Sequence, residues 1–304
     1  MADAKILPIE SAGVTFSVRQ LDCAGETVRY RLVTAAATAA STSTPASAPP
    51  WLLLHGAGHD GGVWEPLAAS LALAGAPVYL PDLPAHGGSG GVPRTSIEDF
   101  ARWTLGVLDA LGLQQVRLVG HSMGSLIALA LAARAPQRCT SLALLGSSVP
   151  LPVAPFLLEA VLAEPERAFA LINKFSFAVP ASEDGEAVAR HQQLLTDNLA
   201  RMRAAGGEVL AHDLHACDRW QGGEAAARSL QVPVLVLGAE LDRMTPLAAS
   251  LALQGLFAGN QAGAIHRQLA GCGHGMMLEQ PAALAQTLFE HAGLTPFDTT
   301  AIQC

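Results

Sequence analysis

The segment GHSMG, residues 120–124, places Ser122 between Gly120 and Gly124, directly after the apolar run VRLV at 116–119. An Ala- and Leu-rich run follows it, so the serine lies where a predicted buried strand meets a predicted helix. The glycines leave room for neighbouring backbone around a strained serine, and the free N–H groups at the start of a helix would lie beside a developing oxyanion. This context favours a nucleophile over the alternative, a plain turn between a strand and a helix.

A serine hydroxyl is a weak nucleophile at neutral pH and needs an adjacent base. Of the ten histidines, His274 lies in a loop, LAGCGHGMMLEQP, that follows the last strand-like run. Gly271, Gly273 and Gly275 surround it, so the loop is predicted to be exposed and mobile. The histidines inside predicted helices or strands are poorer candidates: His191, His212, His215, His266 and His291. We predict His274 as the general base, the alternative being a turn residue.

A catalytic histidine needs a carboxylate that fixes its tautomer and stabilises the imidazolium. The segment AELDRMTP follows the strand-like run VPVLVL and offers Glu240 and Asp242. Asp242 is preferred because it lies at the predicted loop tip, just before a helix that starts with proline. The alternatives are Glu240 in this role, or Asp242 as a helix cap or surface acid.

An oxyanion hole requires two backbone N–H donors. Met123 follows the proposed nucleophile and supplies the first. The loop in LLLHGAGHDGGVW, after the first predicted buried strand, supplies the second, for which we predict Ala57 with Gly58 as the alternative. His55 and His59 in the same loop are interpreted as residues that shape the loop rather than as catalytic groups.

The elements that must position these residues follow from hydrophobic patterning. Residues 14–20 and 27–33 alternate apolar and polar side chains, which predicts an antiparallel hairpin. Short continuous apolar runs, typical of strands buried on both faces, occur at 51–54, 77–80, 116–119, 142–145, 232–237 and, more weakly, 264–269. Helix-like segments lie between them at 63–74, 96–111, 123–135, 245–257 and 281–291. This alternation predicts a mostly parallel sheet with helices on both faces, whose strand ends collect the active groups.

The alternation stops between residues 149 and 231, where the sequence predicts only helices, at 156–175, 184–206 and 208–220. We therefore predict a helical cap at 149–231 inserted into a core formed by 1–148 and 232–304. The Ala-, Ser-, Thr- and Pro-rich stretch 34–50 is predicted to be a flexible connection.

Composition limits the class of protein. The formal net charge is −8 and there is no basic cluster, so nucleic acid is not expected as a partner. No apolar stretch is long enough for a transmembrane helix, and the first residues lack the pattern of a secretory signal. The five cysteines are scattered without metal-ligand spacing or a disulfide framework. We expect a cytoplasmic protein with a small-molecule substrate, no membrane insertion, no cofactor and no metal; its oligomeric state is left open.

Taken together, these motifs resemble those of the α/β-hydrolase superfamily, in particular its capped, esterase-like members. The chain order Ser122, Asp242, His274 is that family's order, and HGAG, PDLPAHGGSG, GHSMG, LGAELDRMTP and GCGHGMMLEQP match its motifs over about 51–146 and 232–290. The resemblance implies a mostly parallel eight-stranded sheet flanked by helices, with an inserted helical cap. A serine at 122 differs from the aspartate of the epoxide-hydrolase and haloalkane-dehalogenase branches, and HGAG differs from the HGGG of some lipases. PDLPAHGGSG is interpreted as part of the pocket rim.

The expected activity is hydrolysis of a small or medium, largely uncharged carboxylic ester through an acyl-enzyme. The scarcity of Lys and Arg in the predicted cap disfavours a phosphorylated or CoA-bound substrate. Several side chains could either line the pocket or pack the cap: Phe156, Phe169, Phe175, Phe177, Trp220, Met276, Met277, Arg167, Arg190, Arg201 and Arg203. The alternatives are hydrolysis of a carbon–carbon bond in a dienoic diketone, acyl transfer to an alcohol, and a binding protein without turnover.

Overall fold

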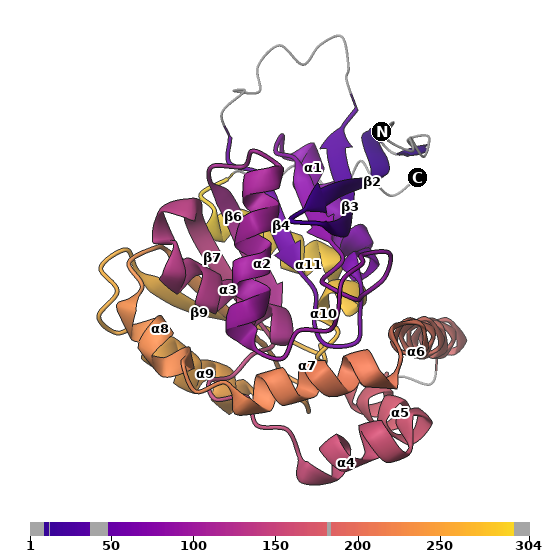
Figure 1. Ribbon diagram of the computed structural model, residues 1–304. Helices are drawn as coiled ribbons and strands as arrows, with labels where there is room; N and C mark the ends of the chain where they lie inside the picture. Colours follow the sequence, from indigo (N-terminus) through magenta and orange to yellow (C-terminus); the bar gives the residue numbers. More distant parts are fainter. Residues whose placement is uncertain (1–8, 12, 37–47, 181–183, 295–304) are drawn as a thin grey trace.

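The computed structural model describes residues 9–11, 13–36, 48–180 and 184–294, and within these ranges nine strands form one sheet (Figure 1). The strand order is β1-β2-β3-β5-β4-β6-β7-β8-β9. The strands are β1 (Ile9–Ser11), β2 (Val14–Cys23), β3 (Glu26–Ala35), β4 (Trp51–Leu54), β5 (Val78–Pro81), β6 (Val116–His121), β7 (Cys139–Leu145), β8 (Val234–Ala239) and β9 (Ala264–Leu269).

All eight strands expected from the sequence are present, and β1 adds a short ninth strand at the edge. β2 and β3 form the expected antiparallel hairpin, and β3 pairs antiparallel with β5. From β5 through β4, β6, β7 and β8 to β9 the pairing is parallel. The carboxyl ends of the parallel strands therefore share one edge of the sheet, where the predicted site residues follow β4, β6, β8 and β9.

Successive side chains of the central strands alternate between two apolar cores, one on each face of the sheet. In β6, Leu118 faces the core that contains helices α2 (Ile97–Ala110) and α3 (Met123–Arg134), and Val119 faces the other. That second core contains α1 (Glu65–Leu73) and α11 (Pro281–His291). Burial on both faces explains why these strands are continuous apolar runs.

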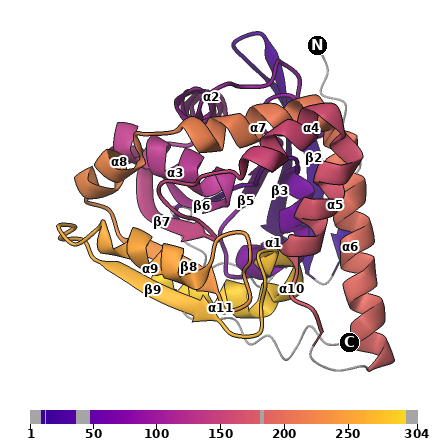
Figure 2. The same ribbon diagram turned by 90° about the horizontal axis from the view of Figure 1, so that it is seen from below.

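The remaining helices are α4 (Pro155–Ala163), α5 (Pro165–Ser176), α6 (Gly185–Ala205), α7 (Gly207–Arg219), α8 (Gly223–Ser229), α9 (Leu247–Gly255) and α10 (Met276–Glu279), with 3-10 turns at Gly61–Trp64 and Pro136–Arg138. We call α4–α7 the cap helices. Figures 1 and 2 show them gathered at one end of the sheet. They share their own apolar core, to which Phe169, Met202, Leu210 and Leu214 contribute.

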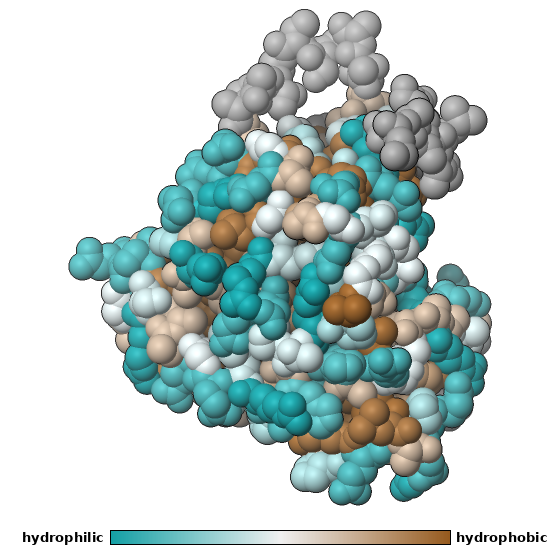
Figure 3. All heavy atoms as spheres, viewed as in Figure 1, coloured by the Kyte–Doolittle hydropathy of each residue, from teal (hydrophilic) through white to brown (hydrophobic). Residues whose placement is uncertain are grey.

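The cap leaves part of its apolar surface in contact with solvent. In Figure 3, apolar side chains gather over the region of the cap helices, whereas polar and apolar side chains are mixed over the rest of that face. Phe156 and Leu162 of α4 are 57% and 64% exposed. No helix in the described part of the chain is long and apolar enough to cross a membrane.

Three details differ from the sequence-based expectations. The helix expected at 156–175 is divided into α4 and α5, because Pro165 begins a new helix and Glu164 between them is non-helical. The short helices α8 and α10 were not expected. Most of the connection predicted at 34–50 lies outside the described residues, and its first two residues extend β3 to Ala35.

Candidate active site

Ser122 lies at the carboxyl end of β6 in a strained backbone conformation. Its φ is 54° and its ψ is −120°, a region that non-glycine residues seldom adopt. Hydrogen bonds on both sides fix this conformation: Ser122 N–H donates to Leu145 O over 2.9 Å, and Ser125 N–H donates to Ser122 O over 2.9 Å. Backbone strain that the surroundings hold in place is often found at functional sites.

The two glycines of GHSMG are required by close backbone contacts rather than by positive φ. A Cβ on Gly120 would lie 2.1 Å from Gly124 O, and a Cβ on Gly124 would lie 2.2 Å from Leu54 O. The turn between β6 and α3 therefore packs directly against the end of β4. This packing brings Ser122 next to the HGAG loop, residues 55–58. A Cβ on Gly56 in that loop would lie 3.2 Å from the Ser122 Cβ.

Asp242 and His274 form a buried pair between the loops after β8 and β9, so the prediction that the His274 loop is exposed is wrong at the histidine itself. Asp242 Oδ2 lies 2.8 Å from His274 Nδ1. The carboxylate accepts further hydrogen bonds, from the N–H groups of Met244 and Thr245 at Oδ1 and from the Thr245 hydroxyl at Oδ2. Since Nδ1 donates to Asp242, His274 Nε2 is left to exchange a proton with another group.

These contacts determine the ionisation of Asp242. Burial by itself would raise its pKa, but the neighbouring His274 and the hydrogen bonds from His274 and Thr245 outweigh burial and lower the pKa from 3.8 to about 2. The carboxylate is therefore ionised throughout the neutral range.

A measurable dependence of stability on pH follows from this pKa. Because the pKa is depressed in the folded state, Asp242 stabilises the fold above about pH 4, and this contribution is lost as the pH falls toward 2. We expect the difference in unfolding free energy between wild type and Asp242→Asn to shrink by about 2 kcal/mol between pH 5 and pH 2. Denaturant titrations of both proteins over this range measure it. A difference that stays constant with pH would contradict the expectation.

The HGAG loop holds its peptide groups in fixed orientations. His55 Nε2 accepts from Leu83 N–H over 3.0 Å, so Nδ1 carries the proton and donates to Gly56 O over 2.9 Å. Burial and the charge of His86 lower the pKa of His55 well below its ordinary value, which keeps it neutral. Ala57 N–H has no hydrogen-bond acceptor among the described residues, as an oxyanion donor requires.

A cavity of about 340 Å³ lies beside Ser122 and His274. Its other walls come from the HGAG loop, the loop after β8 and the cap, and they are mostly apolar. The lining side chains include Leu151, Val153, Phe156, Leu157, Ile172, Phe175, Leu210, Leu214 and Met244. The site therefore combines a strained serine, an oriented histidine and an apolar chamber.

Residues 49–281 match the sequence profile of the family described as alpha/beta hydrolase fold. The chain belongs to the α/β-hydrolase superfamily. It is 33% identical over 255 residues to the 2-hydroxymuconate semialdehyde hydrolase of Pseudomonas sp. (strain CF600), covering 78% of this chain and 84% of that protein.

Solved structures of this superfamily share the fold. A thermophilic esterase superposes with a TM-score of 0.71 at 24% identity and covers 92% of this chain and 100% of its own. The enol-lactonase of Burkholderia xenovorans LB400 superposes with a TM-score of 0.75 at 22% identity, covering 90% of this chain and 99% of its own. At this level of identity the similarity concerns the fold alone.

Several residues of this α/β hydrolase that are near the site carry no distinguishing signal in the sequence. His121 Nε2 donates to His274 O over 2.9 Å, and the two rings lie 4.5 Å apart. Burial lowers the pKa of His121 well below its ordinary value, so it supports His274 as a neutral group. Thr245, which holds the Asp242 carboxylate, was also missed. His121 directly precedes Ser122 in the sequence and Thr245 lies three residues after Asp242, but their contacts depend on the relative placement of two loops.

Other candidates lie elsewhere. Glu240 is exposed and accepts from Gly271 N–H over 2.7 Å, so it is Asp242 that contacts His274. His266 lies in β9 and contacts the Ser250 hydroxyl. Among the aromatic and sulfur side chains, Phe156 and Phe175 line the cavity, whereas Phe169, Trp220, Met276 and Met277 are in the apolar cores.

The arginines expected as possible substrate ligands have other contacts. Arg167 and Arg203 form ion pairs with Glu164 and Glu166, and Arg190 donates to Glu279 O. None of these, nor Arg201, lines the cavity beside Ser122. In the described ranges, no group of three or more His, Cys, Asp or Glu side chains is placed to hold a metal ion.

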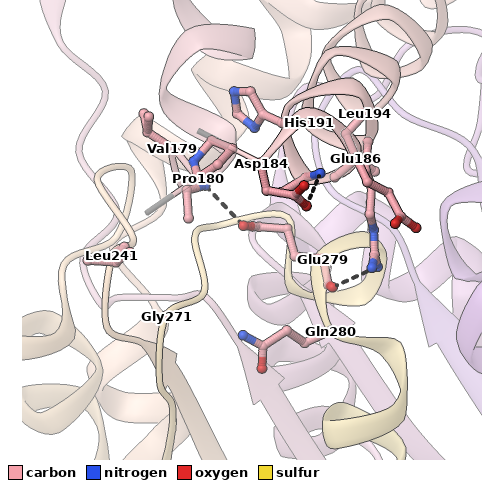
Figure 4. Close-up of a pocket in the computed structure, with 13 residues that line it drawn as sticks. Val179, Pro180, Asp184, Glu186, His191, Leu194, Leu241, Gly271, Glu279 and Gln280 are labelled. Atoms are coloured by element: carbon pink, nitrogen blue, oxygen red, sulfur yellow. Dashed lines mark hydrogen bonds between the residues drawn. The ribbon is translucent and has the colours of Figure 1, made fainter. Parts of the chain in front are cut away.

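The end of cap helix α5 docks on the His274 loop. Gly275 N–H donates to Ser176 O over 2.7 Å, and the Glu279 carboxylate accepts from Ala178 N–H over 2.9 Å and from Gly273 N–H over 3.0 Å. Figure 4 shows Glu279 between these segments, at a separate surface cavity of about 410 Å³ that Val179, Pro180 and Leu241 help to line. Burial raises the pKa of Glu279, although both N–H groups oppose this shift.

Proposed function

We propose that this α/β hydrolase cleaves small or medium, largely uncharged carboxylic esters by nucleophilic catalysis at Ser122. The observation that carries the proposal is the buried Asp242–His274 hydrogen bond of 2.8 Å beside a cavity that both His274 and the strained Ser122 line. A serine, a histidine oriented by a carboxylate and unpaired backbone N–H groups are the parts that acyl transfer requires.

In this mechanism His274 Nε2 removes the Ser122 proton as the Ser122 oxygen attacks the ester carbonyl. The N–H groups of Ala57 and Met123 stabilise the oxyanion, and Asp242 stabilises the imidazolium. The imidazolium then protonates the leaving alkoxide, which departs and leaves Ser122 acylated. His274 then removes a proton from water, which attacks the acyl-enzyme; as the acid is released, the imidazolium returns this proton to the departing Ser122 oxygen.

The lining of the cavity supports an uncharged substrate. Among its described residues, Arg243 is the one with a permanently charged side chain, and its guanidinium already donates to Lys174 O and Phe177 O. The same group lies 4.9 Å from the Phe175 ring, which it covers. Burying a carboxylate in the remaining, apolar part of the chamber would be unfavourable.

A second candidate is the hydrolysis of a carbon–carbon bond in a dienoic diketone, performed by the same three residues. The observation that favours it is the 33% identity to a 2-hydroxymuconate semialdehyde hydrolase. A substrate of this kind carries a carboxylate, for which Arg243 is the one permanently charged cation among the described lining residues. The two candidates therefore differ in whether Arg243 contacts the substrate.

Two measurements test these candidates together. Native protein is treated with a fluorophosphonate, and we expect the added mass on the peptide that contains Ser122. Turnover is then compared on p-nitrophenyl esters of increasing acyl length and on a 2-hydroxymuconate semialdehyde, which separates ester from carbon–carbon hydrolysis. Absence of an adduct on Ser122 in folded protein would contradict the mechanism, and turnover of the dienoate alone would replace the ester proposal with the second candidate.

A further inference from the structure

A fully buried aspartate of the cap contacts the HGAG loop directly. Asp213 lies on α7, and its side chain has no exposed surface. Its Oδ2 accepts from Gly58 N–H over 2.9 Å and lies 2.8 Å from His86 Nε2. Gly58 directly follows Ala57, the proposed oxyanion donor, so the carboxylate acts on the backbone next to that donor.

His86, from the loop after β5, is the charged partner of this carboxylate. Its Nδ1 lies 2.9 Å from Pro84 O, which can only accept, and its Nε2 contacts the Asp213 carboxylate. Both ring nitrogens therefore carry a proton. Burial opposes this charge, but the Asp213 carboxylate and the hydrogen bonds outweigh burial and raise the pKa of His86. The pair is an ion pair without solvent contact.

Together these contacts fix the two peptide groups on either side of Ala57. His55 Nδ1 holds Gly56 O, so the planar Gly56–Ala57 peptide directs the Ala57 N–H away from that bond. In the next peptide, Ala57 O lies 2.8 Å from His59 Nδ1, and the Gly58 N–H is held by Asp213. The Ala57 N–H is thereby left unpaired but fixed in direction.

We propose that Asp213 is a positioning residue for the oxyanion hole. By accepting a hydrogen bond from the Gly58 N–H, this residue of cap helix α7 fixes the orientation of the Ala57 donor. This inference rests on the proposed ester hydrolysis. A buried ion pair often contributes little net stability compared with apolar side chains, so stability alone is a weak reason for its presence. Fixed orientation of a donor, in contrast, lowers the barrier because no reorganisation is needed during the reaction.

Three variants separate the hydrogen bond from the charge. Asp213→Leu removes the acceptor of the Gly58 N–H, and we expect kcat to fall by about 10- to 100-fold with KM nearly unchanged. Asp213→Asn and His86→Gln keep an acceptor for the Gly58 N–H but remove the ion pair. We expect both to lower Tm while keeping kcat close to wild type. Glu208→Gln, an acid-to-amide change at an exposed position of the same helix, is the control and should change neither quantity.

The experiment is performed on full-length protein that has been shown to hydrolyse an ester and to be labelled on Ser122. A purely structural role would make kcat follow Tm across the series. The inference is overturned if Asp213→Leu keeps the wild-type kcat, or if Asp213→Asn loses as much kcat as Asp213→Leu. If Asp213→Leu does not fold, Asp213→Ala, which removes the acceptor without adding bulk, should show the same loss of kcat, and an unchanged kcat there also overturns it. Absence of both turnover and labelling in the wild type is a separate result: it refutes the proposed function, on which this inference rests.

Discussion

Replacing Ser122 with alanine is expected to lower kcat for ester hydrolysis by about 10⁴-fold or more, with little effect on stability. The alanine cannot form the acyl-enzyme, whereas the cavity and the Asp242–His274 pair remain in place. Steady-state kinetics on the best ester of the panel, together with thermal denaturation, measure both effects. If Ser122→Ala retained more than a small fraction of wild-type activity, the reaction would not pass through this hydroxyl.

The loss of kcat in Ser122→Ala should not add to the losses caused by replacing His274 or Asp242. Once the nucleophile is absent, His274→Ala has no further proton transfer to remove, so the double variant should be about as active as either single variant.

Asp242→Asn should lower kcat by about 10⁴-fold, because the amide favours the wrong histidine tautomer. Glu240→Gln is the matched control two residues away and should retain wild-type kcat. Additive losses, or a larger loss in Glu240→Gln, would contradict these assignments.

Replacing Gly124 with alanine is expected to destabilise the fold by about 3 kcal/mol or more, the upper range for overpacking. The added Cβ would lie 2.2 Å from Leu54 O and 2.6 Å from His55 O, and neither is a side-chain atom that could rotate away. Relief requires the start of α3 to separate from β4, which would also displace Ser122. Chemical denaturation and kcat should therefore both respond.

Gly255→Ala is the matched control for this prediction. It is the last residue of α9, and a Cβ there would have no neighbour within 4 Å. Alanine favours helix over glycine, so the control should be neutral or slightly stabilising. Equal stability of Gly124→Ala and wild type would mean that the turn between β6 and α3 is more open than the structure indicates.

The strands of the central sheet could be predicted from the sequence because their burial is visible in short runs of consecutive residues. A strand buried on both faces must be apolar at every position, so runs such as 51–54 and 142–145 can be recognised as buried strands. Residues that follow such runs share one edge of a parallel sheet, which is why Ser122, Asp242 and His274 could be chosen from their positions. The direct Asp242–His274 contact and the rejection of Glu240 required the loop geometry.

The contacts of the cap could not be predicted in this way. Asp213 is 127 residues from His86 and 155 from Gly58, and it lies on a helix whose periodicity shows a buried face but not its partner. A buried aspartate in a helical pattern is locally indistinguishable from a solvated one. The division of α4 from α5, in contrast, has a local cause in Pro165 that the sequence contains.

The contacts of the cap with both loops limit how this enzyme could be recombined. Helix α7 holds the HGAG loop through Asp213, and the end of α5 holds the His274 loop through Ser176 O and Ala178 N–H. A chimaera that exchanged residues 149–231 for the cap of a relative would thus alter the reaction centre along with substrate preference. Such an exchange should succeed only when the incoming cap supplies a carboxylate opposite His86 and matching backbone contacts, so that selectivity and rate would evolve as linked traits in this chain.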